Sequence, residues 1–243
     1  MVSDYVKLSG ESSQNLPHFS TLPPLVKPSG LSAQPRILIL APHPDDECLM
    51  AGLALRMKDE WSAQVTVVPY SYGSNVARRK ARAQELQAAA TVLGFDVLQR
   101  VSLEKITAPE FEDVLKTCAP EIIFSPHSRD FHPIHIAAHI LVAHSGWLAT
   151  QSAVKKVIWI QTEYWQENLN PNLFVPLSLL NVIKIGEALM KHKGEISRNP
   201  YHLRLPAWYI DQARRAQEIL PTTNPVAGGP APHFIFGQLL QIV

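Results

Sequence analysis

The sequence contains few cysteines and no long apolar run, and its charges balance. Only two of its 243 residues are cysteines, Cys48 and Cys118, which excludes a disulfide framework and a metal site built from paired cysteines. No stretch reaches the roughly 20 apolar residues that a membrane-spanning helix needs. Lysine and arginine total 22 against 21 aspartate and glutamate residues, so neither nucleic acid nor an acidic membrane surface is an expected partner.

Several enzyme and targeting motifs are also missing. No G-x-G-x-x-G motif follows a strand, and the Walker A, G-x-S-x-G and H-E-x-x-H motifs do not occur. The first 34 residues carry charges and prolines where a secretory signal would have a continuous apolar segment. We therefore expect a soluble, cytoplasmic protein.

The chain divides into two parts by composition. Residues 1–34 are rich in serine and proline and have no hydrophobic period, so we interpret them as an extended N-terminal arm. The arm is either a loosely ordered tail or, as a second interpretation, a segment that crosses a neighbouring subunit. Residues 35–243 are expected to form a single domain, because a chain of this length can bury one large core.

Short apolar segments alternate with longer amphipathic ones from residue 36 onward. The expected strands cover 36–41, 65–70, 97–103, 121–125 and 157–161, and the expected helices cover 48–57, 78–93, 110–117, 133–148, 181–192 and 207–220. The strand segments are continuously apolar, which is typical of strands buried on both faces of a parallel sheet. This alternation predicts a Rossmann-like, doubly wound α/β fold, mostly parallel, with helices on both faces.

Histidine is the unusual component of the composition. Five of the ten histidines lie between His127 and His144. Another histidine follows the first expected strand, in the run Ala41-Pro42-His43-Pro44-Asp45-Asp46-Glu47. Ligands of doubly wound folds bind beyond the carboxyl ends of strands, so this loop is the first place to look for a site. It is either a capping turn with exposed acids or part of a metal site, in which His43 and Asp46 converge on one cation.

A second cluster follows the expected strand over 121–125 and contains His127, Asp130, His132 and His135. Parallel strands end at one edge of a sheet, so this cluster is expected beside His43. Together His43, Asp46 and His135 would form the open three-ligand set of a catalytic zinc site, with a fourth position for water.

The neighbouring polar residues then have natural catalytic roles. Asp45 is the candidate general base for the water, because it is a carboxylate that the metal does not need. His132 is the candidate group that stabilises an oxyanion or protonates a leaving amine. Zinc would lower the pKa of its water to about 7 and polarise a carbonyl oxygen.

The other histidines have structural interpretations that weigh against a metal role. His139 lies one turn beyond His135 and could pair with it on zinc, but packing or support of the site is the favoured interpretation. His127 is a candidate pocket residue, and His144 is expected to be structural. The remaining four, His18, His192, His202 and His233, are expected on the surface or as satisfied polar groups.

The loop motif, together with Asp130-x-His132-Pro133-x-His135, resembles the LmbE-like (PIG-L) de-N-acetylase family. Weaker similarities lie at Ser71-Tyr72-Gly73, Arg82-x-x-Glu85, Ala89 and Leu93-Gly94, so that the resemblance covers about residues 36–192. It implies a Rossmann-like fold, one divalent metal ion (usually Zn²⁺, with Fe²⁺ as an alternative), and hydrolysis of N-acetyl groups on amino sugars. It also implies a homo-oligomer of unstated size.

The resemblance assigns the same residues as the spacing does. His43, Asp46 and His135 match the family's metal ligands, Asp45 its general base, and His132 its oxyanion or general-acid histidine. The sequence departs from the family pattern in two places. Ile134 stands where an acid commonly follows the His-Pro pair, so Asp130 is the nearest carboxylate that could tune His132. The Asp-Gly segment that contacts substrate in many relatives is also absent after the third expected strand.

The substrate is expected to be a small N-acetylated sugar or glycoconjugate. Arg82, His127, Asp130 and Trp165 are the candidate substrate-binding residues. Two other functions stay open at this point: an amidase that acts on a larger sugar or thiol conjugate, and a metal- or sugar-binding protein without turnover. The presence of Asp45 argues against the second, because binding alone does not need it.

Overall fold

The protein is described by a computed structural model over residues 22–98, 100, 102–149, 157–220 and 234–243. The strands are β1 (Arg36–Ala41), β2 (Gln64–Pro69), β3 (Asp96–Val97), β4 (Ile122–Pro126), β5 (Ile158–Thr162), β6 (Leu173–Leu177) and β7 (Phe236–Ile242). The helices are α2 (Asp46–Trp61), α3 (Val76–Leu93), α4 (Ala108–Cys118), α5 (Pro133–Ala143), α6 (Gly146–Ala149), α7 (Leu179–Leu189), α8 (Lys193–Ile196) and α9 (Tyr201–Ile219).

The strands form one seven-stranded sheet in the order β3-β2-β1-β4-β5-β7-β6. The first five strands of this order are parallel, and β7 runs antiparallel to both of its neighbours. The chain leaves β1 toward β2 and β3, then returns to build β4 and β5 on the other side of β1. The carboxyl ends of β1 and β4 therefore flank the topological switch point, where doubly wound folds bind their ligands.

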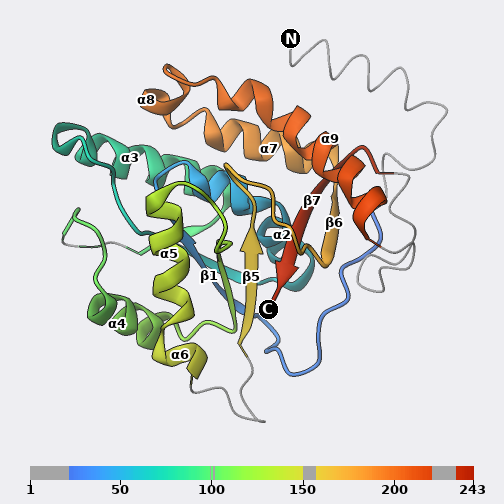
Figure 1. Ribbon diagram of the computed structural model, residues 1–243, viewed down its shortest axis with the longest axis horizontal. Coiled ribbons are helices and arrows are strands. Elements are labelled where there is room, and N and C mark those ends of the chain that lie inside the picture. The colour runs from blue at the N-terminus through green and yellow to red at the C-terminus, as the bar shows by residue number, and fades with distance from the viewer. Residues whose placement is uncertain (1–21, 99, 101, 150–156, 221–233) are drawn as a thin grey trace.

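The two faces of the sheet bury separate apolar cores, as the continuous apolar strands predict. Along β1, Ile37 and Ile39 face a core shared with α2, α3, α7 and α9, whereas Leu38 and Leu40 face a core shared with α4 and α5. Figure 1 shows α4, α5 and α6 together on one side of the sheet and α7 beside α9 on the other. The predicted fold class is confirmed.

The third expected strand, over 97–103, is wrong in extent: among the described residues β3 ends at Val97, followed by one more bond from the Leu98 N–H to the Val67 carbonyl at 3.0 Å. The neighbouring β2 ends at Pro69, which has no N–H to continue the ladder. The carbonyl of Pro69 accepts a hydrogen bond from Arg100 Nη1 at 3.2 Å. A side chain therefore takes the acceptor that a longer β3 would have used.

Other differences concern the boundaries of helices and elements that have no prediction. The expected helix over 133–148 breaks after α5, where the Ser145 hydroxyl donates to the Val142 carbonyl and Glu112 accepts the Gly146 N–H before α6 begins. The strands β6 and β7 and the short helix α8 were not predicted, and α2 and α9 begin earlier than expected. β7 pairs between β5 and β6, a contact between distant segments that no local pattern indicates.

The described part of the arm, residues 22–34, lies against the chain's own domain. Arg56 Nη2 donates to the Pro23 carbonyl at 2.6 Å, and Trp61 Nε1 donates to the Leu25 carbonyl at 3.1 Å. The Ser32 N–H donates to Glu121 at 2.7 Å. Residues 1–21 of the predicted arm lie outside the described residues. Within the described ranges, no helix is both long enough and apolar enough to cross a membrane.

Candidate metal centre

The turn between β1 and α2 buries its acids. Asp45, Asp46 and Glu47 are 9%, 5% and 0% exposed, which contradicts the interpretation of this loop as a capping turn with exposed acids. The Asp45 side chain makes no capping hydrogen bond, although Asp45 occupies the N-cap position of α2. Asp46 Oδ2 instead accepts the His43 N–H at 2.9 Å, and Glu47 Oε2 accepts the Asp45 N–H at 2.8 Å.

The backbone of Asp45 has φ 125°, a conformation that non-glycine residues rarely adopt. Such backbone geometry costs free energy and persists only where the surrounding contacts impose it. Here it leaves the Asp45 carboxylate free of α2, so that the side chain is available for a role other than capping.

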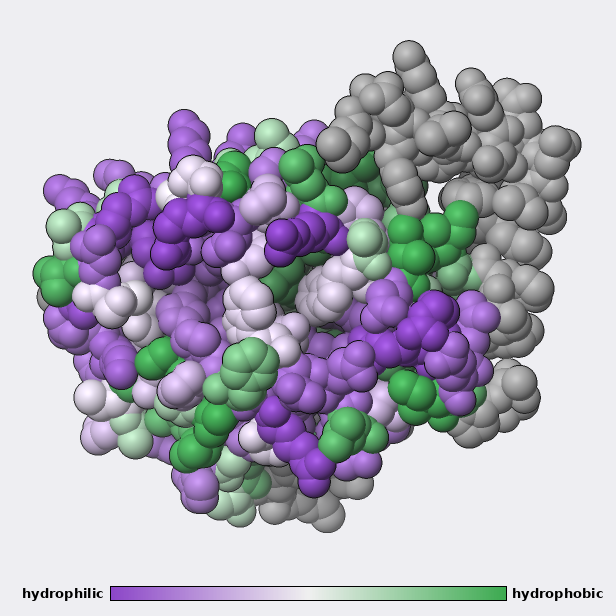
Figure 2. Space-filling view, turned by 45° about the horizontal axis from the view of Figure 1, so that its top comes forward, coloured by the Kyte–Doolittle hydropathy of each residue, from purple (hydrophilic) through white to green (hydrophobic). Residues whose placement is uncertain are grey.

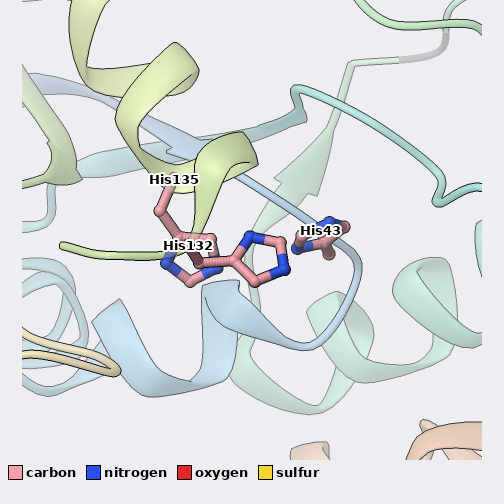
Figure 3. Close-up of side chains that lie close together, drawn as sticks. All are labelled: His43, His132 and His135. Atoms are coloured by element: carbon pink, nitrogen blue, oxygen red, sulfur yellow. The ribbon is translucent and has the colours of Figure 1, made fainter.

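Three histidines meet above this turn. The nearest donor nitrogens of His43, His132 and His135 all lie within 4.8 Å of one another. Figure 3 shows His132 and His135 at the start of α5 and His43 on the turn after β1, with their rings close together. His132 is the N-cap residue of α5, and Pro133 occupies the first helical turn, where its missing N–H costs nothing.

One carboxylate oxygen joins two of these histidines. Asp46 Oδ2 lies 3.3 Å from His43 Nδ1 and 3.4 Å from His135 Nε2. Two donor atoms that bind one tetrahedral zinc ion at about 2.0–2.1 Å are themselves separated by roughly 3.3–3.4 Å. The donor types and their spacing therefore fit a divalent cation held by His43, Asp46 and His135, and His132 is close enough to reach the same cation.

The electrostatics of this cluster favour a positive charge. Burial alone would lower the pKa of His135, but the carboxylates of Asp46 and Asp130 outweigh it and raise that pKa to about 10. Burial would raise the pKa of Asp46, but His135 and His43 lower it. The same carboxylates that raise the His135 pKa would also attract a metal ion, and metal binding would displace a proton from this histidine.

Asp130 orients His135 rather than the ring of His132. Its Oδ2 atom lies 3.2 Å from His135 Nδ1, and its Oδ1 atom accepts the backbone N–H of His132 at 2.9 Å. A carboxylate on the far nitrogen is how proteins fix the tautomer of a metal-binding histidine. The expectation that Asp130 tunes the His132 ring by direct contact is therefore not met: that ring accepts the Ile134 N–H at Nδ1, at 3.3 Å.

This contact sets the tautomer of His132. Because Nδ1 accepts a hydrogen bond, the neutral ring carries its proton on Nε2 and can donate it. Burial and the neighbouring His135 and His43 lower the pKa of His132, which favours this neutral form. This backbone N–H has the opposite effect to a carboxylate on Nδ1, which would accept a hydrogen bond there and favour the charged ring.

The residues of this site lie in a part of the chain that matches a known protein family. Residues 38–145, which contain the turn after β1 and all of α5, match the sequence model of the PIG-L family, described as GlcNAc-PI de-N-acetylase. The resemblance to the PIG-L family is confirmed. The match stops before β5, so the C-terminal strands and α7–α9 lie outside it. A comparison with curated proteins finds no match.

Solved structures share the fold. One is GalB, the 4-carboxy-2-hydroxymuconate hydratase from Pseudomonas putida KT2440, with 21% identity, a TM-score of 0.62, and coverage of 86% of this chain and 96% of that chain. N,N'-diacetylchitobiose deacetylase from Pyrococcus horikoshii has 15% identity, a TM-score of 0.60 and coverage of 85% and 83%. The A40926 pseudoaglycone deacetylase Dbv21 has 16% identity, a TM-score of 0.62 and coverage of 86% and 98%. At these identities the likeness shows the fold alone.

Arg82, in the PIG-L segment, lies against the candidate base. Its Nη2 atom donates to the Pro44 carbonyl at 2.9 Å, and it lies 3.3 Å from Asp45 Oδ1 and 3.6 Å from Glu195 Oε1. Gly73, with φ 91°, lets the guanidinium pass, because a Cβ atom there would lie 2.5 Å from Arg82 Nη1. The Arg82 guanidinium, a candidate for substrate binding, is therefore already in contact with protein groups. Burial and Asp46 nevertheless outweigh Arg82, so the pKa of Asp45 is raised.

Two further histidines of the matched segment, residues 38–145, contact backbone groups through their ring nitrogens. His127 Nε2 lies 2.8 Å from the Gln166 carbonyl, and His127 Nδ1 accepts the Arg129 N–H at 3.2 Å, which leaves no free nitrogen for a substrate. His139 Nδ1 lies 3.1 Å from the Pro126 carbonyl, and its ring stacks on Trp159. The geometry of His139 agrees with the packing interpretation.

Aromatic side chains border the candidate centre. The Tyr164 ring meets His135 edge-on at 4.9 Å, and its hydroxyl donates to the Asp46 carbonyl at 3.1 Å. Trp165 is 47% exposed and meets Tyr201 edge-on, while its backbone N–H donates to Asp130 Oδ2. Burial and the site acids, Asp45 first, raise the pKa of Tyr201 to about 12. The molecular surface on the face shown in Figure 2 is hollowed near its centre.

A buried ion pair supports the loop that carries these aromatic residues. Arg215, on α9, places its Nη2 atom 2.5 Å from Glu163 Oε2, and the two side chains are 7% and 2% exposed. The other Glu163 oxygen accepts the Asn168 N–H at 2.8 Å. The pair therefore fixes both ends of the segment that contains Tyr164 and Trp165.

We expect Arg215→Leu to lower the free energy of unfolding by about 3–5 kcal/mol, because it leaves the Glu163 carboxylate buried without its cation. Urea denaturation followed by circular dichroism measures the change. The matched control is Arg214→Ala on the same helix, where an exposed arginine bonds Asp211 and Glu218; its expected change is below about 0.5 kcal/mol. Equal effects of the two substitutions would show that the buried pair has no special weight.

Proposed function

We propose that the protein is a divalent-metal N-deacetylase that releases acetate from an N-acetylated amino sugar or a related small amide. The observation that carries the proposal is the position of Asp46 Oδ2 between His43 Nδ1 and His135 Nε2, beside the separate buried carboxylate of Asp45. The PIG-L match over residues 38–145 supports this activity, as do deacetylases among the solved structures with this fold.

His43, Asp46 and His135 would hold the metal ion, which we propose to be zinc. When bound, zinc lowers the pKa of its water to about 7 and polarises a carbonyl oxygen. The remaining residues would carry out the proton transfers. Asp45 would accept a proton as the water oxygen attacks the amide carbon, and its raised pKa suits a group that holds this proton in the next step.

His132 would act on the other side of the reacting amide. Its Nε2–H would donate to the oxygen that gains negative charge in the transition state, which is a role for a neutral, positioned donor. The C–N bond then breaks, the amine leaves with a proton from the site, and acetate remains. No cofactor other than the metal ion is needed for this hydrolysis.

The second candidate is hydration of a carbon–carbon double bond, because GalB has the same fold and a hydratase activity. The charges of the site favour the deacetylase. The acids Asp45, Asp46, Asp130 and Glu195 surround it, and both nearby arginines, Arg82 and Arg198, are paired with acids. A substrate with several carboxylates would find neither of these arginines free to bind it, whereas a neutral sugar amide needs no such partner.

The test is a screen of the zinc-loaded full chain against N-acetylated sugars, with free amine and acetate measured in parallel. We expect equal amounts of both products from at least one sugar and none from the metal-free protein. Release of a larger acid with the amine would identify the amidase alternative. Loss of ultraviolet absorbance from an unsaturated dicarboxylate, with neither product from any amide, would identify a hydratase and contradict the proposal.

A further inference from the structure

Glu47 follows two of the site residues in the chain, but its carboxylate points to a different partner. It is 0% exposed, and its Oε2 atom accepts the Asp45 N–H at 2.8 Å. Its Oε1 atom lies 2.6 Å from His192 Nε2 and accepts a weaker bond from Cys48 Sγ at 3.3 Å. Glu47 thus connects the strained backbone of Asp45 to a histidine located 145 positions later.

His192 is fully buried and lies between α7 and α8, outside the segment that matches PIG-L. Of the three groups that donate to Glu47, His192 Nε2 is the closest, and among the described residues the only other donor to Oε1 is the weaker Cys48 thiol. Loss of the His192 N–H would therefore leave Oε1 poorly satisfied in a buried place and free the carboxylate to turn. Because the same carboxylate holds the Asp45 N–H, a change at His192 reaches Asp45 through one side chain.

Glu195, three residues after His192, lies beside the arginine that contacts the candidate base. Glu195 is 8% exposed, and its Oε1 atom lies 3.6 Å from Arg82 Nη2, the guanidinium nitrogen that also contacts Asp45 Oδ1. Between them, the Gly194 N–H donates to Glu85 Oε1 on α3 at 3.2 Å. One short segment, 192–195, therefore contacts both supports of Asp45, Glu47 on its backbone and Arg82 on its side chain.

We propose that His192 and Glu195 are positioning residues, which hold Asp45 in its reactive orientation through Glu47 and Arg82 respectively. The proposal rests on the proposed function, in which Asp45 is the general base. It assigns a task in the reaction to a part of the chain that carries none of the proposed metal ligands.

A metal site is the competing explanation, since donor atoms of Glu47, Cys48 and His192 lie within 4.8 Å of one another. The 2.6 Å separation of His192 Nε2 and Glu47 Oε1 favours a hydrogen bond. Two donors that share one zinc ion at normal bond lengths stay roughly 3 Å or more apart. The proposal therefore expects one zinc ion per chain, whereas the competing explanation expects two.

The experiment compares three variants of the full zinc-loaded chain. His192→Leu removes the donor to Glu47, and His192→Gln keeps an N–H donor at a similar position. Lys193→Ala is the control, because Lys193 is an exposed residue of the same segment. For each variant we would measure kcat and KM separately, zinc per chain, and hydrogen exchange of the Asp45 amide by NMR.

We expect His192→Leu to lower kcat by about 10–100-fold with KM nearly unchanged, because a misplaced base affects the chemical step more than binding. Its Asp45 amide should exchange faster, because Glu47 no longer holds it. His192→Gln should keep kcat within about threefold of the parent, because it restores the donor. Lys193→Ala should match the parent in every measurement.

Three results would overturn the proposal. The first is a His192→Leu variant with the kcat and the Asp45 exchange rate of Lys193→Ala. The second is a His192→Gln variant as impaired as His192→Leu, since the ring and not the donor would then matter. The third is two zinc ions in the parent and one in His192→Leu.

Glu195→Gln provides an independent measurement if His192→Leu fails to fold. It keeps the size of the side chain and removes the negative charge beside Arg82, so kcat should fall while Tm and zinc content stay at the parental values. An unchanged kcat would remove Glu195 from the proposal.

Amide exchange separates this proposal from the proposed function. If the parent deacetylates nothing, yet His192→Leu alone accelerates exchange at Asp45, the function is wrong and the positioning contact stands.

Discussion

Asp45→Asn is expected to keep its zinc and to lose roughly 10²–10⁴-fold in kcat, the usual contribution of a general base. Asparagine has nearly the same shape as aspartate but cannot accept the proton of the attacking water. It is also a better choice than alanine, because it keeps the size of the side chain and one of its oxygens. The measurements are zinc per chain and kcat for acetate release.

The control for this substitution is Asp59→Asn on α2, where the aspartate is exposed and the same change of charge occurs far from the proposed ligands. It should keep both zinc and turnover. An Asp45→Asn variant with parental kcat would show that another group takes the proton. A variant without zinc would show instead that Asp45 is a ligand.

His135→Ala is expected to lose the metal itself. It removes one of the two imidazole nitrogens that lie beside Asp46 Oδ2 and leaves the Asp130 carboxylate without its imidazole partner. Because substitutions beside a metal ligand already cost 10–100-fold in metal affinity, loss of the ligand should weaken zinc binding by more than about 100-fold. Elemental analysis after dialysis against a mild chelator measures this change, and turnover should fall to background.

His144→Ala is the matched control for this experiment. It removes an exposed histidine from the other end of α5, where Nδ1 contacts only the Ile140 carbonyl of the same helix. Zinc content and turnover should remain parental. Full zinc occupancy in His135→Ala would contradict the proposed ligand set and would favour His132, the other histidine within reach, as the third ligand.

The sequence predicted most of the sheet because the information is local. The segment over 36–41 has apolar side chains at every position after Arg36, and each face of β1 does pack on a separate core. The elements that were missed depend on distant partners. β7 contains Gly237 and two glutamines, which interrupt its apolar residues and weaken the local signal, yet it pairs between β5 and β6. The predicted strand over 97–103 is short because Pro69 on the neighbouring strand ends the pairing.

The site residues, like the strands, divide into those that the local sequence predicts and those that depend on distant partners. The proposed ligands come from two strand ends that the fold class brings together, so spacing along the chain was sufficient to group them. The roles of supporting residues were not predictable in this way. The substrate role of Arg82 stays a prediction, but its contact with Asp45 has no signal in the sequence. His192, expected on the surface or as a satisfied polar group, is a buried polar group whose partner, Glu47, the sequence does not indicate. The contacts of His192 and Glu195 depend on where α8 packs, which no motif in the sequence states.

The backbone of Asp45 places stability and activity in conflict at a single position. Glycine adopts positive φ at little cost, whereas any other residue at φ 125° loses conformational free energy of about 1–3 kcal/mol. Selection for thermal resistance alone would therefore favour glycine at position 45 and would remove the proposed base in the same step. A thermostabilised variant obtained without an activity screen is liable to be a folded, metal-binding and inert protein.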